Sequence, residues 1–181
     1  MPCPLAGIIF PPSNKHLSIL NTPLFDEKPI RSIKEWMLAH NETIAVAESV
    51  TSGLVQFAFS TAEDAMKFYQ GGITVYNLGQ KSRHLHIEPI HALSCDCVSE
   101  QVSREMALNV STLFTSDWGI GITGFASPVP ESGNKLFAFY AIVHLGKIHT
   151  SGKINAEKNE PFKVQTFFVA SLLNGLADQL P

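Results

Sequence analysis

The sequence has few charged residues and no excess of basic ones. Among its 181 residues are 13 Lys or Arg and 16 Asp or Glu, which gives a formal net charge of −3 and a charged fraction of 16%. Proteins that bind nucleic acid by neutralising phosphates normally carry a basic excess or a basic stripe, and this chain has neither. We therefore expect no nucleic-acid partner. The low charge and the 12 Phe are compatible with an oligomer interface.

Long hydrophobic runs are also missing. The apolar run nearest the N-terminus, residues 5–10, is too short for the core of a signal peptide, and Pro4, Pro11 and Pro12 flank it. No stretch approaches the roughly 20 apolar residues of a membrane span. We expect a cytoplasmic protein that does not engage a membrane.

Cysteine is scarce: the chain has three, and two of them stand too close together for a relaxed disulfide. Such usage is typical of a reducing compartment. Three histidines precede that pair, so five potential metal ligands fall within 14 residues: His84, His86, His91, Cys95 and Cys97. Their spacing matches no closed zinc pattern, and we expect neither a metal nor another cofactor, with a zinc module as the alternative.

The length suits one domain. A chain of this mass buries about 70% of its unfolded surface on folding, which is enough for one sizeable core and marginal for two. Residues 1–29 are rich in proline and lack periodicity, so we interpret them as an irregular arm, with the domain at residues 30–181. Hydrophobic patterns predict strands at 43–47, 73–78, 118–122, 136–145 and 147–154. Helices are expected over 33–40, 52–59, 62–69, 80–85, 99–113 and 162–176. Strands and helices that alternate early and a late hairpin indicate an α/β fold, a three-layer α/β/α sandwich with a mixed sheet.

Hydroxyl residues follow the first predicted strand, in the run Glu48-Ser49-Val50-Thr51-Ser52-Gly53. At a junction of strand and helix, unpaired backbone N–H groups and the positive helix end favour an anion. A serine there could be a nucleophile whose oxyanion those amides hold. Ser and Thr before a helix are also common as simple N-caps, so both interpretations stay open.

A nucleophilic serine needs a base, and the spacing of the histidines suggests no His–Asp pair. Lys81 falls near the start of a predicted helix, just after the strand that carries Tyr76. A helix N-terminus and partial burial both disfavour the charged form of a lysine, which would leave it able to accept a proton. The alternative is a solvated surface lysine.

Taken together, four segments resemble the C-terminal domain of the CinA competence/damage-inducible proteins, a domain that also occurs alone as nicotinamide-mononucleotide deamidase. The family pattern has AESCTGG, a strand that ends in TYSN with a lysine shortly after it, a VSE helix, and a TGIAGP loop. The matching segments are AESVTSG at 47–53, GGITVYN followed by Lys81, CVSEQVSREMA at 97–107 and DWGIGITGFASP at 117–128. The resemblance covers roughly residues 30–178.

The resemblance implies an amidohydrolase that converts a carboxamide of a small nucleotide to a carboxylate and ammonia without a metal. By matching positions, it implies Ser49 as nucleophile and Lys81 as base, with Tyr76 beside them as a third catalytic residue that positions or relays the proton. It also implies substrate-binding positions at Glu48, Thr51, Gly53, Thr123, Gly124 and Lys135, and a homodimer, which is common in the family.

The sequence departs from the family pattern where the nucleotide would be held. Ser52 and Ser127 replace glycines, and residues 157–159 read Glu-Lys-Asn where an arginine is expected. Lysine does not reproduce the bidentate geometry with which arginine binds phosphate. Two hypotheses follow: an amidohydrolase with a Ser-Lys dyad, or a catalytically weak or inactive relative that binds a ligand or partner.

Overall fold

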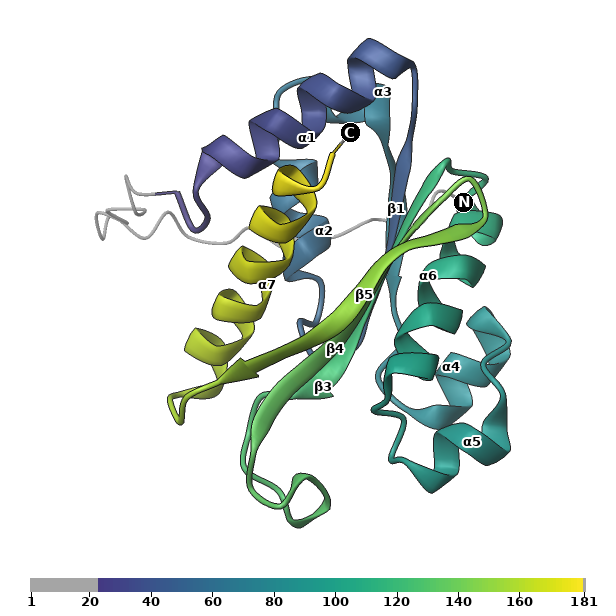
Figure 1. Ribbon diagram of the computed structural model, residues 1–181, viewed down its shortest axis with the longest axis vertical. Helices are drawn as coiled ribbons and strands as arrows, with labels where there is room; N and C mark the ends of the chain where they lie inside the picture. Colours follow the sequence, from purple (N-terminus) through teal and green to yellow (C-terminus); the bar gives the residue numbers. More distant parts are fainter. Residues whose placement is uncertain (1–22, 181) are drawn as a thin grey trace, which may run out of the picture.

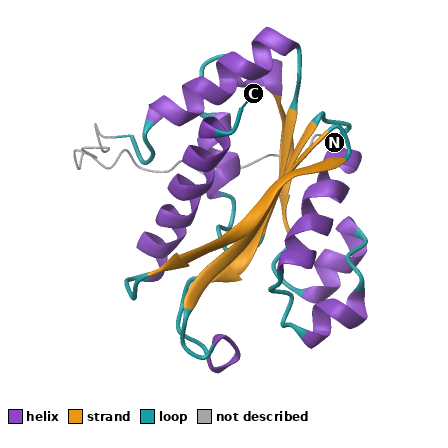
Figure 2. Ribbon diagram, viewed as in Figure 1, coloured by secondary structure: helices purple, strands orange, loops and turns teal. Residues whose placement is uncertain are grey.

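The computed structural model describes residues 23–180, and a mixed five-stranded sheet runs through their centre. The strand order is β2-β1-β3-β4-β5, with β1 parallel to β2 and β3, and the last two pairings antiparallel. The strands are β1 (Ile44–Glu48), β2 (Tyr69–Thr74), β3 (Trp118–Phe125), β4 (Leu136–His144) and β5 (Lys147–Ala156). Helices cover both faces, so the predicted three-layer α/β sandwich with a mixed sheet is confirmed (Figures 1 and 2).

One face of the sheet is covered by α1, α2 and α7, and the other by α4, α5 and α6 (Figure 1). The helices are α1 (Glu27–His40), α2 (Leu54–Ser60), α3 (Ala65–Phe68), α4 (Leu78–Leu85), α5 (Pro89–Ser94), α6 (Glu100–Phe114) and α7 (Pro161–Asp178), with a 3₁₀ turn at Pro130–Ser132. None of the helices in the described residues is both long and apolar enough to cross a membrane.

The first helix begins earlier than predicted. Asp26 caps α1 by accepting a hydrogen bond from the Lys28 N–H, and Pro29 is tolerated because the first turn needs no N–H donor there. Residues 27–29, which were assigned to the irregular arm, are therefore the first turn of α1. Residues 1–22 of that expected arm lie outside the described residues.

The predicted helix 62–69 is too long at both ends, and the predicted strand 73–78 is placed too late. Helix α3 spans only Ala65–Phe68, and β2 already begins at Tyr69. The pair Gly71-Gly72, which in the sequence looks like the end of the preceding helix, lies inside β2, where Gly72 pairs with Val46. A Cβ on Gly72 would lie 2.5 Å from the Val46 carbonyl oxygen, so the glycine permits close contact with β1.

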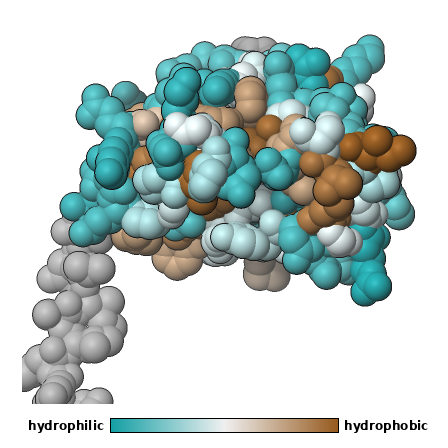
Figure 3. Space-filling model, turned by 90° about the horizontal axis from the view of Figure 1, so that it is seen from below, coloured by the Kyte–Doolittle hydropathy of each residue, from teal (hydrophilic) through white to brown (hydrophobic). Residues whose placement is uncertain are grey.

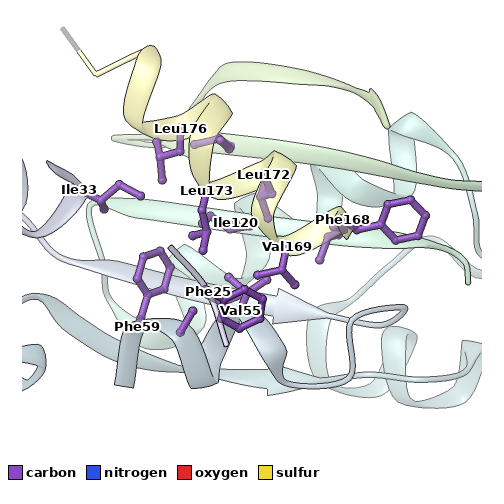
Figure 4. Packing of buried hydrophobic residues seen from close by; sticks show 14 of the residues in the cluster. Phe25, Ile33, Val55, Phe59, Ile120, Phe168, Val169, Leu172, Leu173 and Leu176 are labelled. Carbon is purple, nitrogen blue, oxygen red and sulfur yellow. The ribbon is translucent and has the colours of Figure 1, made fainter. Parts of the chain in front are cut away.

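The two larger hydrophobic cores of the described residues lie one on each side of the sheet. On the first, one face of α7 packs against the sheet and against α1, and Figure 4 shows the close contacts. Its side chains include Val169, Leu172, Leu173 and Leu176, none more than 1% exposed. Each side chain buried to this extent contributes about 1.5–3 kcal/mol.

The second core depends on a close approach between α6 and β3. Gly121 faces that helix, and a Cβ added there would lie 2.6 Å from the Ala107 nitrogen. The glycines of the predicted strand 118–122 therefore serve to bring the helix backbone onto the sheet.

Candidate active site

The candidate site lies at the carboxyl ends of the three parallel strands, where an open α/β sheet commonly binds ligands. Ser49 directly follows β1, the centre of the three. Its N–H donates to the Ile122 carbonyl of β3 at 3.0 Å, and the Glu48 carbonyl accepts from the Val75 N–H at 2.8 Å. Hydrogen bonds to both neighbouring segments therefore hold the Ser49 backbone in place.

The Glu48 carboxylate organises the turn that follows. It is fully buried and accepts hydrogen bonds from the Thr51 hydroxyl and from the backbone N–H groups of Gly53, Val55 and Gln56. An acidic group at a helix N-terminus pairs with N–H donors that the helix itself cannot satisfy. Glu48 and Thr51 thus shape the turn from inside, and neither lines the pocket as a substrate-binding residue would.

Gly53 also has a backbone role. It precedes α2 with φ at +98°, a conformation that glycine adopts at little cost. Ser52, the first departure from the family pattern, has φ at +51° and an exposed side chain that does not line the pocket. Its added bulk therefore lies outside the space where a substrate would bind.

The amides at the start of α2 were expected to hold an oxyanion, and this expectation is wrong. The N–H groups of Gly53, Val55 and Gln56 donate to Glu48, and that of Leu54 donates to the Thr51 carbonyl. Within residues 23–180, no acceptor is found for the N–H of Val50 or Thr51. Of the two residues only Val50 lines the pocket, so its amide, adjacent to Ser49, is the one that a negatively charged oxygen in the pocket could reach.

Lys81 reaches Ser49 from a different element. Asn77 caps α4 by accepting from the Gln80 N–H at 3.1 Å, and this places Lys81 one turn into the helix, facing the sheet. The Lys81 Nζ donates to Ser49 Oγ at 2.9 Å and to the Val75 carbonyl at 2.8 Å. The structure thus brings together the two residues that the sequence pairs as a dyad, although their catalytic roles remain predictions.

Burial lowers the pKa of Lys81 to about 8, because the charged ammonium loses its water. The side chain is 1% exposed, and within residues 23–180 no carboxylate is among its hydrogen-bond partners. Cys97 lies near enough to act in the opposite direction, and burial raises the pKa of its thiol. A substantial fraction of Lys81 is therefore neutral near pH 8 and able to accept a proton from Ser49.

Tyr76 lines the pocket, and its side chain is 73% exposed. In the described part of the chain its hydroxyl makes no hydrogen bond to Ser49 or Lys81. The predicted strand carried Tyr76 beside the dyad, but β2 ends at Thr74 and the tyrosine projects into solvent at the pocket mouth. The geometry therefore places Tyr76 at the mouth of the pocket rather than within the dyad.

The three remaining positions that were predicted to bind substrate differ in whether they line the pocket. Thr123 is buried and lines the pocket, but its hydroxyl already donates to the Cys97 carbonyl at 2.8 Å. Gly124 lines the pocket too, and its missing side chain is required by β4, since a Cβ would lie 2.6 Å from Ala138 Cα. Lys135 is exposed and does not line the pocket, so its predicted contact with a substrate stays a prediction.

The pocket around Ser49 and Lys81 has a volume of about 560 Å³. Sequence reasoning missed three polar residues in its wall: Asn77, Asp96 and Gln165.

The Gln165 side chain donates to the Val50 carbonyl at 2.8 Å and so connects α7 to the turn after Ser49. No local signal identifies Gln165, because the two residues are 115 positions apart. Asn77 could have been found as the helix cap that follows a strand.

Figure 3 shows the face of the molecule that carries this edge of the sheet, with apolar surface gathered on the side of α4 and α5. The exposed apolar side chains of α5 are Ile90 and Leu93, and Leu93 also lines the pocket. The mouth of the pocket is therefore bordered by apolar surface on one side.

The histidines and cysteines of the alternative metal site do not form a ligand set, although His91 Nε2 lies 3.8 Å from Cys95 Sγ. His91 Nε2 lies 2.9 Å from Ser99 Oγ, and His84 Nε2 lies 3.0 Å from the Gln80 side-chain oxygen. No group of three or more residues suited to a metal ion occurs among residues 23–180.

Comparison with known protein families shows to which family this chain belongs. The model of the CinA C-terminal domain matches residues 26–180. The chain belongs to the CinA C-terminal domain family. A CinA-like protein from Prochlorococcus marinus (strain MIT 9215) is 32% identical over 155 residues, which cover 83% of this chain and 36% of that protein. A putative competence-damage inducible protein from Listeria innocua is 32% identical over 63% of this chain and 28% of its own length. The chain thus spans about a third of these relatives.

Solved structures of the CinA superfamily have the same fold. One from Klebsiella pneumoniae 700603 superposes with a TM-score of 0.80 at 22% identity and covers 88% of this chain and 98% of its own. Another from Escherichia coli has a TM-score of 0.79 at 25% identity, with 93% and 96% covered. The family domain is therefore present over nearly its whole length.

Proposed function

We propose that this CinA-family domain is an amidohydrolase that cleaves a small carboxamide to a carboxylate and ammonia. The single observation that carries the proposal is the 2.9 Å contact between Lys81 Nζ and Ser49 Oγ at the wall of a pocket. A buried lysine with a lowered pKa, next to a serine hydroxyl, is the arrangement required of a base and its nucleophile.

The reaction proceeds through an acyl-enzyme. Neutral Lys81 takes the Ser49 proton as Oγ attacks the carboxamide carbon, and the negative oxygen of the tetrahedral intermediate binds the Val50 amide. Lys81 then gives its proton to the leaving nitrogen, the C–N bond breaks, and ammonia departs. Water attacks the resulting ester, passes a proton through Lys81 to Ser49, and releases the carboxylic acid.

Measurement of ammonia release from nicotinamide mononucleotide, nicotinamide riboside and nicotinamide tests the proposal. Ser49→Ala should lower kcat by about 1000-fold or more. Ser52→Ala is the matched control, because Ser52 is exposed and does not line the pocket, and it should retain wild-type rates. Turnover that persists unchanged in Ser49→Ala would refute the assigned nucleophile. Absence of turnover with all three amides would favour the alternative, a non-catalytic relative that binds a ligand or partner.

The pH dependence gives a second test of the same assignment. Because only neutral Lys81 accepts the proton, kcat/KM should rise with pH and level off above a pKa of about 8. At pH 6 the rate should be about 100-fold below the plateau. A flat profile between pH 6 and pH 9 would exclude Lys81 as the base.

Oligomeric state remains a prediction. The homodimer expected from the sequence is tested by sedimentation of the full chain, where a single monomer species at micromolar concentration would contradict it.

A further inference from the structure

The carbonyl of Val50 is held by a helix from the other end of the chain. Neighbouring segments fix the rest of this turn: the Ser49 N–H donates to the Ile122 carbonyl at 3.0 Å, and the Ser52 N–H donates to the Ser49 carbonyl at 3.2 Å. The donor to the Val50 carbonyl is the Gln165 side chain of α7, at 2.8 Å. Within residues 23–180 no second donor to this carbonyl is found. The orientation of Val50 therefore depends on a contact that the turn does not make by itself.

Helix α7 presents Gln165 from a fixed position. Val164 is 1% exposed and Phe168 is fully buried, and both belong to the core between α7 and the sheet. Close packing of these neighbours holds the helix backbone beside Gln165 in place. A carbonyl only accepts hydrogen bonds, so the Gln165 amide must turn its nitrogen toward Val50 and cannot reverse without losing the contact.

Val50 also carries the amide on which the proposed reaction depends. Its N–H directly follows Ser49, has no acceptor within residues 23–180, and belongs to a residue that lines the pocket. The N–H and the carbonyl of one residue are joined through a single Cα, so a fixed carbonyl leaves the N–H little freedom to rotate. A donor that stabilises a developing oxyanion must be oriented beforehand, because reorientation during the reaction would cost part of that stabilisation.

Gln165 makes no hydrogen bond to either member of the dyad. Lys81 Nζ donates to Ser49 and to the Val75 carbonyl, and among the described residues the Gln165 side chain bonds to Val50 alone. Because Gln165 also lines the pocket, it can affect the reaction in two ways, through the Val50 backbone or by contact with the ligand. The two effects differ in the kinetic constant that they change.

We propose that Gln165 is a positioning residue, which holds the Val50 carbonyl so that the Val50 N–H stays directed at the oxyanion of the tetrahedral intermediate. This inference rests on the proposed amide hydrolysis and adds a residue of α7 to its machinery. The Val50 amide acts mainly in the transition state, because the oxygen becomes negatively charged only there. Loss of the Gln165 donor therefore lowers kcat and leaves KM nearly unchanged.

Gln165→Met tests the proposal, because methionine has a similar length and no donor. Ammonia release from nicotinamide mononucleotide, or from the riboside or free amide if only these are hydrolysed, should show kcat lowered about 10- to 100-fold and KM changed less than about two-fold. Gln165→Asn, whose amide is one methylene too short for the contact, should lose as much. Asn174→Leu is the matched control, since the Asn174 amide donates at 2.8 Å to the Ala170 carbonyl of its own helix, and it should keep both wild-type constants.

Two kinetic results would overturn the proposal. A wild-type kcat in Gln165→Met or Gln165→Asn would show that the Val50 amide does not need this contact. A raised KM with unchanged kcat would identify Gln165 as a ligand contact instead.

A second measurement needs no turnover. The backbone order parameter of the Val50 amide, from nuclear magnetic relaxation, is about 0.85 for rigid backbone and below about 0.6 for flexible backbone. It should fall by about 0.1–0.25 in Gln165→Met and stay unchanged in Asn174→Leu. The order parameter of Val164 should keep the rigid value in both variants, which shows that α7 remains folded.

These outcomes are distinguishable from failure of the proposed function. If no amide is hydrolysed, the amidohydrolase proposal fails, but the order parameter of Val50 still decides whether Gln165 holds the turn, and an unchanged value would refute that role. If turnover occurs and neither kcat nor the order parameter changes in Gln165→Met, the hydrolase proposal stands and the positioning inference is wrong.

Discussion

Replacement of Lys81 by methionine should make the stability of the protein respond differently to pH. The buried ammonium is disfavoured in the folded state, as the depression of its pKa from 10.5 to about 8 indicates. At about 1.4 kcal/mol per pH unit, keeping this lysine charged costs the folded state roughly 3 kcal/mol at pH 7. Methionine has a similar length and carries no charge, so the variant avoids this cost.

The sign follows from proton binding. Between pH 8 and pH 10.5 the unfolded chain holds a proton on Lys81 that the folded protein has released, so the free energy of unfolding of the wild type rises with pH in that window. Below pH 8 both states are protonated and the full cost remains. Relative to Lys81→Met, the wild type should therefore gain about 2.5 kcal/mol between pH 7 and pH 10.

Urea denaturation at several pH values measures this difference, and the comparison of two variants cancels the other groups that titrate. The variant also loses the hydrogen bonds to Ser49 Oγ and the Val75 carbonyl, but that loss varies little with pH. Lys158→Met, at an exposed lysine, is the control and should change by less than about 0.5 kcal/mol over the same range. A wild-type minus Lys81→Met difference that stays constant from pH 7 to pH 10 would refute the claim that burial depresses this pKa.

Two further predictions concern the packing around the sheet and the turn after β1. Gly121→Ala should lower the free energy of unfolding by about 1–3 kcal/mol or more, because the added Cβ meets the backbone of α6. Gly175→Ala, in α7 with nothing within 4 Å of its added Cβ, should instead raise it by about 0.5–1 kcal/mol, and equal effects of the two in urea denaturation would contradict the close approach. Glu48→Gln should cost about 2–4 kcal/mol and lower kcat, because an amide nitrogen would face the donors that the carboxylate now satisfies. Glu157→Gln, at an exposed glutamate, should be neutral in both measurements, and a neutral Glu48→Gln would show that the buried carboxylate is not needed.

Local sequence patterns determined the order of the elements and the fold class. The buried run that forms β1, the amphipathic repeat of α6 and the hairpin around Gly146 all depend on near neighbours in the chain, and they were predictable for that reason. The errors lie where a distant segment overrides the local signal. Gly72 looks like a helix end in the sequence, but its contact with Val46 and α2 places it inside β2.

In the candidate site, too, some features were predictable from the sequence and others depended on distant segments. A serine after a buried strand and a lysine in the next helix were visible in the sequence, and the family resemblance matched them. The sequence could not show that Glu48 uses the amides at the start of α2, because that depends on where a buried carboxylate points. Nor could it place Asp96 and Gln165 in the pocket wall, since the chain must first close around the sheet.

The sequence by itself thus determined which residues could act as nucleophile and base, because those identities and their spacing are written in the chain. Only the tertiary structure decided that Lys81 is buried within 2.9 Å of Ser49, and burial is what lowers its pKa. The small number of charged residues in the sequence is also reflected in the pocket around Ser49 and Lys81. Among the described residues, the wall of the pocket contains one exposed carboxylate, that of Asp96, and its place there depends on how the chain closes around the sheet.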